Sequence, residues 1–390
     1  MTVAVFVSGR ADLGPLGPVL ARIAEAAHEL LVLTGVGFDA ESAGAALADI
    51  GVNRVVVRAI GPRLVGDTPA DAARTGAALS QGIAEVLDTI EVLVVLGDRW
   101  ELPWVVMPAV LARVPVVHLH GGEVTEGAID ERVRHAITKL SDVHCVASTD
   151  AMDRLVQMGE DPATVHVTGA PGLDRLAEAT PLSDAEIASA LGVDLRRPLA
   201  LFTYHPVTTE SVAEMVHGAV DALLGTADAA ATVIVTHPGP DPGGYAVRDA
   251  LLTAVETLPN VVAVPALGAR YPRVLAACDV VVGNSSSGII EAATVNVPAV
   301  DVGTRQTGRL RAATVTHVDD GRENVKAGVQ RALASPHPHG TMNPYGDGRA
   351  AARIAELILQ IRRPAGPKRF RDLDARVIRR ADQKETLHDE

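Results

Sequence analysis

The sequence predicts an α/β protein made of two doubly wound domains, each a parallel sheet with helices on both faces. The chain has 390 residues and 47% hydrophobic content, more than one core takes up, because single cores stop growing at roughly 250–300 residues. Aromatic residues make up only 3% of the chain, which disfavours an aromatic-rich β-sandwich. Short β-branched runs alternate with segments of helical period, which is the pattern of parallel sheets.

The first half of the chain contains short apolar runs that we predict to be strands, separated by Ala-rich segments long enough for crossover helices. The predicted strands are residues 3–7, 29–34, 54–59, 92–96, 115–119, 144–147 and 165–167. The predicted helices between them include residues 16–27, 70–89 and 132–141.

A second alternation follows a linking segment at residues 172–194. Ser183 and Glu186 in this segment have the spacing of a capping box, which predicts the start of a helix. The strands predicted beyond it are residues 199–203, 232–236, 261–264, 280–282 and 299–302.

These two alternations predict the domain boundaries. We place an N-terminal Rossmann-like domain at residues 1–172 and a C-terminal Rossmann-like, nucleotide-binding domain at residues 173–348. Residues 363–390 are rich in charge and lack apolar periodicity, so we predict a disordered tail, with an interaction tail as the alternative.

Composition and charge exclude several classes of protein. The formal net charge of -13 argues against nucleic acid as a partner, because phosphate binding needs a positive face. Cys145 and Cys278 each lie in an apolar run and are predicted to be buried free thiols, with a disulfide or a nucleophilic role as the alternative. No run approaches the roughly 18 apolar residues of a membrane span, and we expect a cytoplasmic protein.

In doubly wound sheets, ligands bind beyond the carboxyl ends of the strands, so the residues after each strand are the candidates for function. The first strand leads into Ser8-Gly9-Arg10-Ala11-Asp12 and then a helix. Small residues let the backbone approach a ligand, and Arg10 adds a fork of donors for a phosphate. An ordinary glycine-containing turn is the alternative for this loop.

Acidic residues gather after two neighbouring strands. Asp98 follows one strand, where it is a candidate base or a helix N-cap, and the two roles are compatible. Glu123 and Asp130 follow the next strand. Because like charges raise one another's pKa, such a cluster can hold one acid protonated and another ionised, as paired acid and base catalysis requires. A metal site is the alternative, although these spacings match no standard zinc pattern.

The second half offers donors for a diphosphate. His205 follows a strand, where it serves as a titratable imidazole, a phosphate donor or a structural histidine. Gly283 and three serines at 285–287 precede a helix and supply backbone N–H and hydroxyl donors without net positive charge. Glu291 lies about one turn further, where a carboxylate can bind two ribose hydroxyls. An ordinary capped helix is the alternative.

Six short motifs occur in order along the chain, and together they resemble the hydrolysing UDP-N-acetylglucosamine 2-epimerases of the sialic-acid pathway. The resemblance covers about residues 3 to 362. Its motifs are residues 97–101, 120–123 with their continuation to 139, 205–208, 283–291, 305–309 and 343–348.

The resemblance implies a fold of the GT-B type, with the active site in the cleft between two Rossmann-like domains. A helix at residues 349–362 is expected to return to the first domain. The chemistry implied is removal of the C2 proton while UDP leaves C1, giving a 2-acetamidoglucal, followed by addition of water to give N-acetylmannosamine. No metal or redox cofactor is implied, and a homodimer or homotetramer is expected.

The resemblance also assigns site residues. Asp98, Glu123 and Asp130 are the catalytic candidates, without an assignment of the one that takes the C2 proton, and His205 is expected near the diphosphate or the leaving group. The residues expected to bind UDP or substrate are Arg10, Gly268, Tyr271, Ser285, Ser286, Ser287, Glu291 and Arg305.

One departure leaves the sugar open. Relatives often have Tyr-Pro-Asn-Ala-Asp where this chain has His-Pro-Gly-Pro-Asp at residues 237–241, so a diacetamido-trideoxy sugar or another nucleotide remains an alternative. A non-hydrolysing epimerase is a rival, although that branch resembles Glu-Ala-Gly and His-Arg-Arg-Glu-Asn where this chain has residues 122–124 and 205–207. A GT-B glycosyltransferase and a non-enzymatic nucleotide-sugar sensor are the other rivals.

Overall fold

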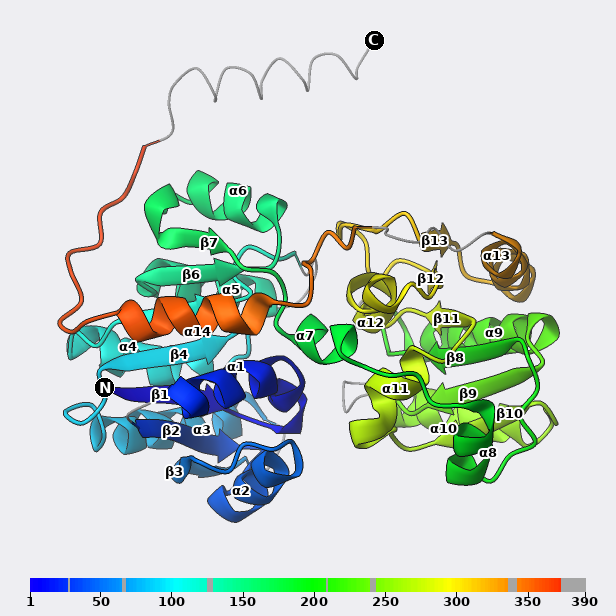
Figure 1. The fold of residues 1–390 in the computed structure, drawn as a ribbon, viewed down its shortest axis with the longest axis horizontal. Helices are drawn as coiled ribbons and strands as arrows, with labels where there is room; N and C mark the ends of the chain where they lie inside the picture. The colour runs from blue at the N-terminus through cyan, green and yellow to red at the C-terminus, as the bar shows by residue number, and fades with distance from the viewer. Residues whose placement is uncertain are drawn as a thin grey trace, which may run out of the picture. The chain divides into compact units, whose positions relative to one another are not determined.

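The computed structural model describes residues 1–26, 29–64, 68–124, 129–207, 210–238, 243–335 and 342–372. The chain divides into two compact units, each with the predicted α/β architecture (Figure 1). Unit 1 comprises residues 1–123 and 129–171 together with the C-terminal segment from Ala350, and unit 2 comprises residues 172–349. Among the described residues, no helix is long and apolar enough to span a membrane.

Unit 1 is built on a parallel sheet of seven strands in the order β3-β2-β1-β4-β5-β6-β7. The sheet grows outward from β1 in both directions, which is the doubly wound arrangement. Its strands are β1 Thr2–Val7, β2 Glu29–Val36, β3 Val56–Arg63, β4 Val92–Leu96, β5 Val116–Leu119, β6 Val143–Val146 and β7 Val165–Val167.

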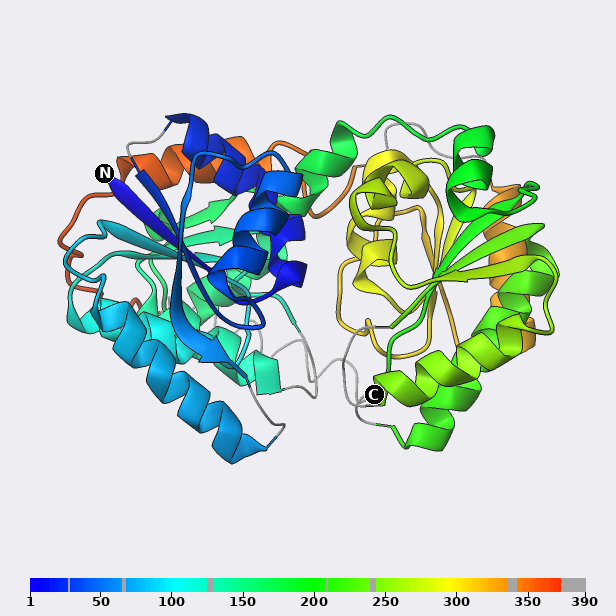
Figure 2. The same ribbon diagram turned by 90° about the horizontal axis from the view of Figure 1, so that it is seen from below.

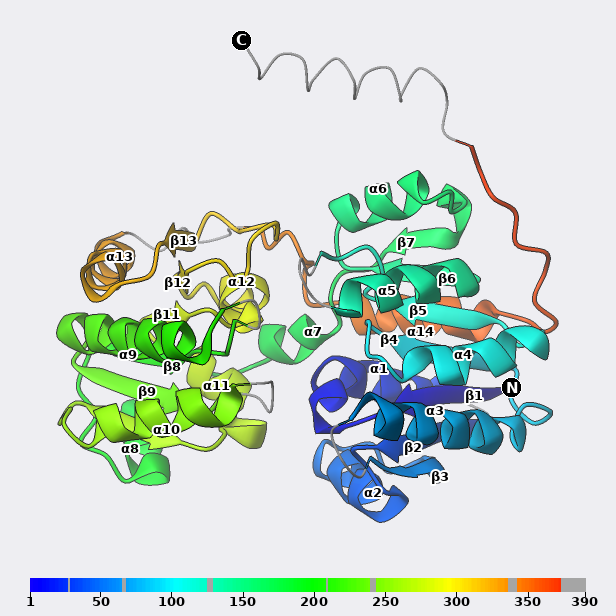
Figure 3. The same ribbon diagram turned by 180° about the vertical axis from the view of Figure 1, so that it is seen from behind.

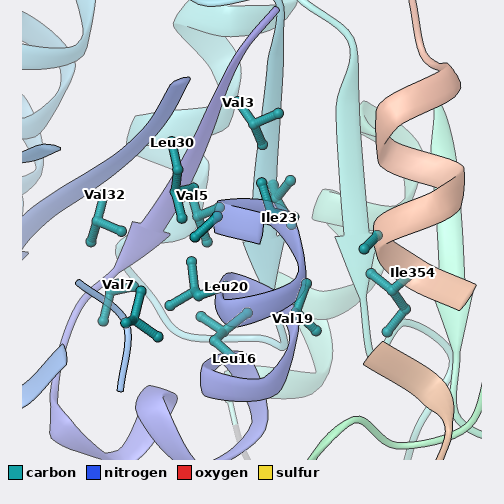
Figure 4. Close-up of a cluster of buried hydrophobic side chains, with 14 of the residues drawn as sticks. Val3, Val5, Val7, Leu16, Val19, Leu20, Ile23, Leu30, Val32 and Ile354 are labelled. Atoms are coloured by element: carbon teal, nitrogen blue, oxygen red, sulfur yellow. The ribbon is translucent and has the colours of Figure 1, made fainter. Parts of the chain in front are cut away.

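Helices cover both faces of this sheet. Figures 1 and 3 show α1 and α14 on one face and α3, α4 and α5 on the other. Figure 4 shows how the first face is filled: Val5 of β1, Leu20 of α1 and Ile354 of α14 point into one cluster and are fully buried. The helices of unit 1 are α1 Leu13–Ala26, α2 Ala40–Asp49, α3 Pro69–Ala84, α4 Leu102–Leu111, α5 Ile129–Leu140, α6 Thr149–Gln157 and α14 Ala350–Gln360.

Unit 2 has a parallel sheet of six strands in the order β10-β9-β8-β11-β12-β13. Figure 2 shows this sheet edge-on with helices on both of its faces. The strands are β8 Leu199–Thr203, β9 Thr232–Thr236, β10 Val261–Val264, β11 Val280–Gly283, β12 Ala299–Val302 and β13 Val315–Val318. The helices are α7 Gly172–Ala177, α8 Asp184–Leu191, α9 Val212–Ala229, α10 Gly244–Val255, α11 Tyr271–Leu275, α12 Ser286–Ile290 and α13 Arg322–Ala334.

The strands expected from the sequence are all present, with the largest shift at β3. The capping box expected at Ser183 and Glu186 is confirmed at the start of α8. The edge strand β13 was not expected, because its four residues, Val315–Val318, lack an apolar run. Short edge strands of this kind are defined by their pairing partner, here β12, rather than by local pattern.

The first residues of the segment predicted to be a disordered tail contact unit 1. Arg363 donates to the carbonyl oxygens of Leu87, Ile90 and Ala112 at 2.7–3.0 Å. Lys368 donates to the Thr138 carbonyl at 2.9 Å, and its Nζ lies 2.6 Å from a Glu160 carboxylate oxygen. These charges bind carbonyl groups at element ends and one buried acid, which charge and periodicity alone do not reveal. Residues 373–390 lie outside the described residues.

Candidate active site

The loop after β1 is a tight turn built around a buried acid. Ser8 N, Ser8 Oγ and Gly9 N all donate to Asp12 Oδ2, at 2.8, 3.0 and 3.1 Å. Burial raises the pKa of Asp12, although the charge of Arg99 and these hydrogen bonds act in the opposite direction. Arg10, expected to bind phosphate, is exposed in the same turn at the start of the short helix η1 (Arg10–Asp12).

The loop after β4 carries Asp98 and an ion pair between the half-exposed Arg99 and the buried Glu101. Arg99 Nε donates to Glu101 Oε1 at 2.6 Å, and the Glu101 side chain is fully buried. Glu101, not Asp98, occupies the N-cap position of α4, so the alternative interpretation of Asp98 as a helix cap is wrong. The carboxylate of Asp98 instead meets Arg134 of α5.

Arg134 joins the acidic loops. Its side chain is 2% exposed, and its Nη2 contacts Asp98 Oδ2 while its Nη1 donates to Glu131 Oε2 at 2.7 Å. The same Nη1 also donates to the backbone carbonyl of Glu123. One guanidinium therefore holds the ends of β4 and β5 and the first turn of α5 together, with Asp98 and Glu123 in a single hydrogen-bonded network.

Asp130 lies in the first turn of α5, beside this network. Burial raises the pKa of Asp130, and the charge of Asp98 raises it further, while Arg134 and Arg99 lower it by less. The site therefore contains one carboxyl that is paired with Arg134, Asp98, and a neighbouring carboxyl with a raised pKa, Asp130. A carboxyl with a raised pKa beside other carboxyls is the arrangement that acid and base roles in one site require.

The loop after β5 requires unusual backbone conformations. Gly122 has φ of 76°, and a Cβ at this position would lie 2.3 Å from the carbonyl oxygen of Ala151. His120 also has a positive φ, of 62°, and its Nδ1 contacts Glu123 Oε1. The loop therefore places Glu123 against an imidazole, with glycine allowing the close approach.

In unit 2, Asn284 clamps three loops at the carboxyl ends of the strands. Its side chain accepts from His205 N at 2.7 Å and donates to His205 O at 2.8 Å. The backbone carbonyl oxygen of Asn284 accepts from Gln306 Nε2 at 2.8 Å and from Arg305 Nη1 at 3.2 Å. Asn284 is fully buried, so the loops after β8, β11 and β12 are held at fixed spacing.

The serines expected to bind diphosphate begin α12. Ser285 is the N-cap residue, and its Oγ accepts from Ser287 N at 3.4 Å and lies 3.1 Å from Ser287 Oγ. Ser286 is the first residue of the helix. Hydroxyl and backbone N–H groups therefore converge at one turn, which suits an anion without a positive side chain.

Glu291, expected to bind ribose, is paired with Tyr271. The Tyr271 hydroxyl donates to Glu291 Oε2 at 2.7 Å, and burial raises the pKa of Glu291 despite this bond. Gly268, with φ of 55°, accepts the backbone N–H of Tyr271 through its carbonyl. The structure thus links Gly268, Tyr271 and Glu291 within unit 2.

The sequence motifs identified most of the candidate site residues, but they did not identify several residues that hold these side chains in place. Asp98, Glu123 and Asp130 converge in unit 1, whereas His205, Arg305 and the serines converge around Asn284 in unit 2. The assigned roles of these residues stay predictions. The organising residues that were not singled out are Asp12, Arg99, Glu101, His120, Arg134, Asn284 and Gln306. Most of these organising residues lie inside the six sequence motifs, and this position was the signal that could have identified them.

Two parallel, doubly wound units with ligand-type loops at the carboxyl ends of their strands define an α/β protein of the GT-B type. The chain belongs to the UDP-N-acetylglucosamine 2-epimerase family, whose sequence model matches residues 22–359.

Three known proteins illustrate the similarity. The UDP-N,N'-diacetylbacillosamine 2-epimerase (hydrolyzing) of Legionella pneumophila is 34% identical over 366 residues, covering 92% of this chain and 95% of the relative. The UDP-N-acetylglucosamine 2-epimerase of Neisseria meningitidis serogroup B is 33% identical over 300 residues, covering 75% of this chain and 78% of the relative. A crystal structure of UDP-GlcNAc 2-epimerase from Neisseria meningitidis bound to UDP-GlcNAc superposes with a TM-score of 0.72 at 16% identity, covering 92% of this chain and 100% of that one, and it supports the fold.

Proposed function

We propose that this protein is a hydrolysing 2-epimerase. It converts UDP-N-acetylglucosamine, or a closely related UDP-acetamido sugar, and water into N-acetylmannosamine, or its analogue, and UDP. The observation that carries the proposal is the network around Arg134, which joins the Asp98 carboxylate to the loop of Glu123 and the first turn of α5. The printed name of the 34% identical Legionella relative, a hydrolyzing 2-epimerase, supports the hydrolytic outcome.

The carboxyl groups of unit 1 supply the proton transfers. Elimination requires a base for the C2 proton, and rehydration requires an acid that returns a proton to C2 from the opposite face. Asp98 contacts Arg134 directly, whereas burial and, next, the charge of Asp98 raise the pKa of Asp130. Asp130, whose pKa is raised, fits the acid that the second half of the reaction requires.

In this proposal, unit 2 binds UDP. The hydroxyls and N–H groups at Ser285, Ser286 and Ser287 receive the diphosphate, with His205 and Arg305 at the neighbouring strand ends. Glu291 binds the ribose hydroxyls, and the backbone from Gly268 to Tyr271 lies against the base. In this assignment Arg10 of unit 1 donates to the substrate phosphate.

The identity of the sugar is a further part of the proposed function. The name of the Legionella relative specifies a UDP-diacetylbacillosamine, whereas that of the Neisseria relative specifies UDP-N-acetylglucosamine. The departure in the motif at residues 237–241 falls partly on residues 239–241, which lie outside the described residues. Both sugars therefore belong in the first assay, and the product serves sialic-acid-type synthesis.

Proton NMR in deuterated water tests this function. Purified protein is incubated with UDP-N-acetylglucosamine or UDP-N,N'-diacetylbacillosamine, and the anomeric signals and free UDP are followed. We expect free UDP together with a reducing 2-epimer that carries deuterium at C2. Epimerised sugar still attached to UDP would support the non-hydrolysing rival. UDP release only with an added acceptor would support a glycosyltransferase, and binding without turnover would support a sensor.

We also propose that the protein forms a homodimer or homotetramer. Helix α4 exposes Trp104, Met107 and Leu111 to 38%, 45% and 79%, and their spacing places them along one side of the helix. A contiguous apolar strip of this kind marks an association surface. Light scattering after size exclusion should give a dimer or tetramer mass, and Met107→Glu with Leu111→Glu should give a monomer. A monomeric wild type would refute this part.

The cytoplasm is the proposed location. Cys145 and Cys278 are free and buried, as expected from the sequence. Burial raises the pKa of the Cys145 thiol to about 12, so the group stays a thiol at neutral pH. Unpaired buried cysteines are typical of reducing compartments, and cell fractionation with an antibody to the protein tests the location.

A further inference from the structure

His120, at the carboxyl end of β5, has a backbone conformation that residues with a Cβ rarely adopt. Its φ is 62°, in the left-handed region. Its backbone N–H donates to the carbonyl oxygen of Cys145 at 3.0 Å, which holds the residue against β6. Unfavourable conformations of this kind persist where the surrounding structure fixes them, and they cluster at active sites.

The two ring nitrogens of His120 have different surroundings. Nδ1 contacts Glu123 Oε1, and the side chains of His120 and Glu123 are only 17% and 16% exposed. Nε2 is buried and has no hydrogen-bond partner within the described part of the chain. A carboxylate opposite Nδ1 favours the tautomer with its proton on Nδ1, which leaves a lone pair on Nε2. A buried lone pair without a donor is unfavourable until a ligand supplies a proton.

We infer that Nε2 of His120 is the base that removes the C2 proton of the sugar, while Glu123 orients the ring and stabilises the imidazolium. The inference rests on the proposed function and assigns the step that sequence motifs leave open among Asp98, Glu123 and Asp130. Glu123 then acts through His120 as a positioning residue. The arrangement is the carboxylate–imidazole pair that serves as a base in unrelated enzymes.

In the elimination step, the C2 proton moves to His120 and UDP leaves C1. The Nε2 lone pair takes the C2 proton, the electrons of the C2–H bond form the C1–C2 double bond, and the C1–O bond breaks with its electrons leaving on UDP. The products are a 2-acetamidoglucal, UDP and an imidazolium beside the Glu123 carboxylate. The imidazolium returns its proton to solvent before the next turnover.

Rehydration requires a second group on the opposite face of the sugar, and we assign this role to Asp130, which lies in the first turn of α5 beside the Asp98–Arg134 pair. Burial, and then the charge of Asp98, raise the pKa of Asp130, so it retains a proton to higher pH than an ordinary aspartic acid. Asp130 gives its proton to C2 while water gives its hydroxyl to C1. The remaining proton of that water restores the protonated Asp130.

The substitution His120→Asn isolates the atom that the inference depends on. Asparagine tolerates the left-handed backbone, and its amide N–H₂ replaces the Nδ1 donor to Glu123, but it has no counterpart of Nε2. We expect kcat to fall by about 10²–10⁴-fold, the usual contribution of a general base, with the Kd for UDP unchanged by calorimetry. The matched control is His217→Asn, a histidine on α9 that is 80% exposed, which should leave kcat unchanged.

Two outcomes of this experiment overturn the inference while the wild type is active. Turnover of His120→Asn close to the wild-type rate shows that Nε2 takes no proton. A raised Kd for UDP with an unchanged kcat shows that His120 is a binding donor instead.

A second measurement does not depend on turnover. Nitrogen-15 NMR of the folded protein reports which ring nitrogen of His120 carries the proton. We expect the Nδ1–H tautomer in the wild type and a loss of that preference in Glu123→Gln. An Nε2–H tautomer in the wild type overturns the inference. A wild type that hydrolyses neither UDP sugar refutes the proposed function instead, and the two failures are thereby distinguished.

Discussion

The two units present opposite kinds of chemistry at the carboxyl ends of their strands. In unit 1 the loops carry ionisable groups held in pairs, as Arg134 holds Asp98 and Arg99 holds Glu101. In unit 2 the loops are organised by a neutral amide, Asn284, and carry serine hydroxyls. The same doubly wound architecture therefore supports a proton-transfer surface in one unit and an anion-binding surface in the other.

This difference between the units shows that charged site residues have a larger desolvation penalty than neutral ones. Buried charges lose hydration, and only well-placed partners offset that loss, so the paired groups of unit 1 depend strongly on one another. A neutral clamp such as Asn284 has a smaller desolvation penalty and fixes backbone donors in advance. Substitutions in unit 1 should therefore change turnover, whereas substitutions in unit 2 should change affinity for UDP.

The largest expected effect is on turnover. Asp98→Asn and Glu123→Gln should each lower kcat by about 10²–10⁴-fold, because each removes a charged partner of the proton-transfer network while keeping its shape. The Kd for UDP, measured by calorimetry, should change little. Asp153→Asn, on the exposed side of α6, is the control. Full turnover in both variants would remove the assigned roles and with them the contrast between the units.

The next effect concerns the clamp of unit 2. Asn284→Ala removes the two hydrogen bonds of its side chain to the backbone N–H and C=O of His205, each worth about 0.5–1.5 kcal/mol. We expect the Kd for UDP to rise by about 10–100-fold, with kcat at saturating substrate affected less. Calorimetry with UDP and steady-state kinetics separate the two quantities. A loss confined to kcat would contradict the division of roles between the units.

A smaller effect is the pH dependence of folding contributed by His118 in unit 1. Burial lowers the pKa of His118 to about 3 from 6.5, and its Nε2 lies 2.7 Å from the Gly97 carbonyl oxygen. Because the folded pKa is the lower one, the stabilisation is complete above pH 6.5 and is lost as pH falls toward 3, by up to about 1.4 kcal/mol per pH unit.

Urea unfolding at pH 7, 6 and 5 measures this slope. His118→Gln keeps an amide donor in place of Nε2–H but does not titrate, so its free energy of unfolding should fall less steeply with acid than that of the wild type. Equal slopes in the two proteins would show that His118 does not carry the acid sensitivity.

The smallest expected effect is that of a chelator. In the proposed mechanism the carboxylates of unit 1 work with arginines and an imidazole, so excess EDTA should leave the rate of UDP release unchanged. The rate of UDP release is measured with a coupled assay before and after dialysis against EDTA. A rate that falls and is restored by one divalent ion would place a metal at this acidic surface.

The sequence by itself determined most of the secondary structure, though not the edge strand β13, and the position of the functional loops. Alternation between β-branched runs and helical segments is a local property, and residues that follow a strand in a parallel sheet must lie at its carboxyl edge. Asp98 and Ser285 were therefore located correctly after β4 and β11. The family motifs added the chemical interpretation of those loops.

Only the tertiary structure decided how these residues are partnered. That Arg134 joins the loops after β4 and β5, that Asn284 holds the loop of His205, and that Lys368 packs on Glu160 depends on contacts between segments far apart in sequence. The same contacts set proton affinity, because burial and the nearest charge determine the pKa of a group such as Asp130. Local sequence specifies which groups a loop carries, whereas packing specifies which of them are in contact and in which direction the pKa of each is shifted.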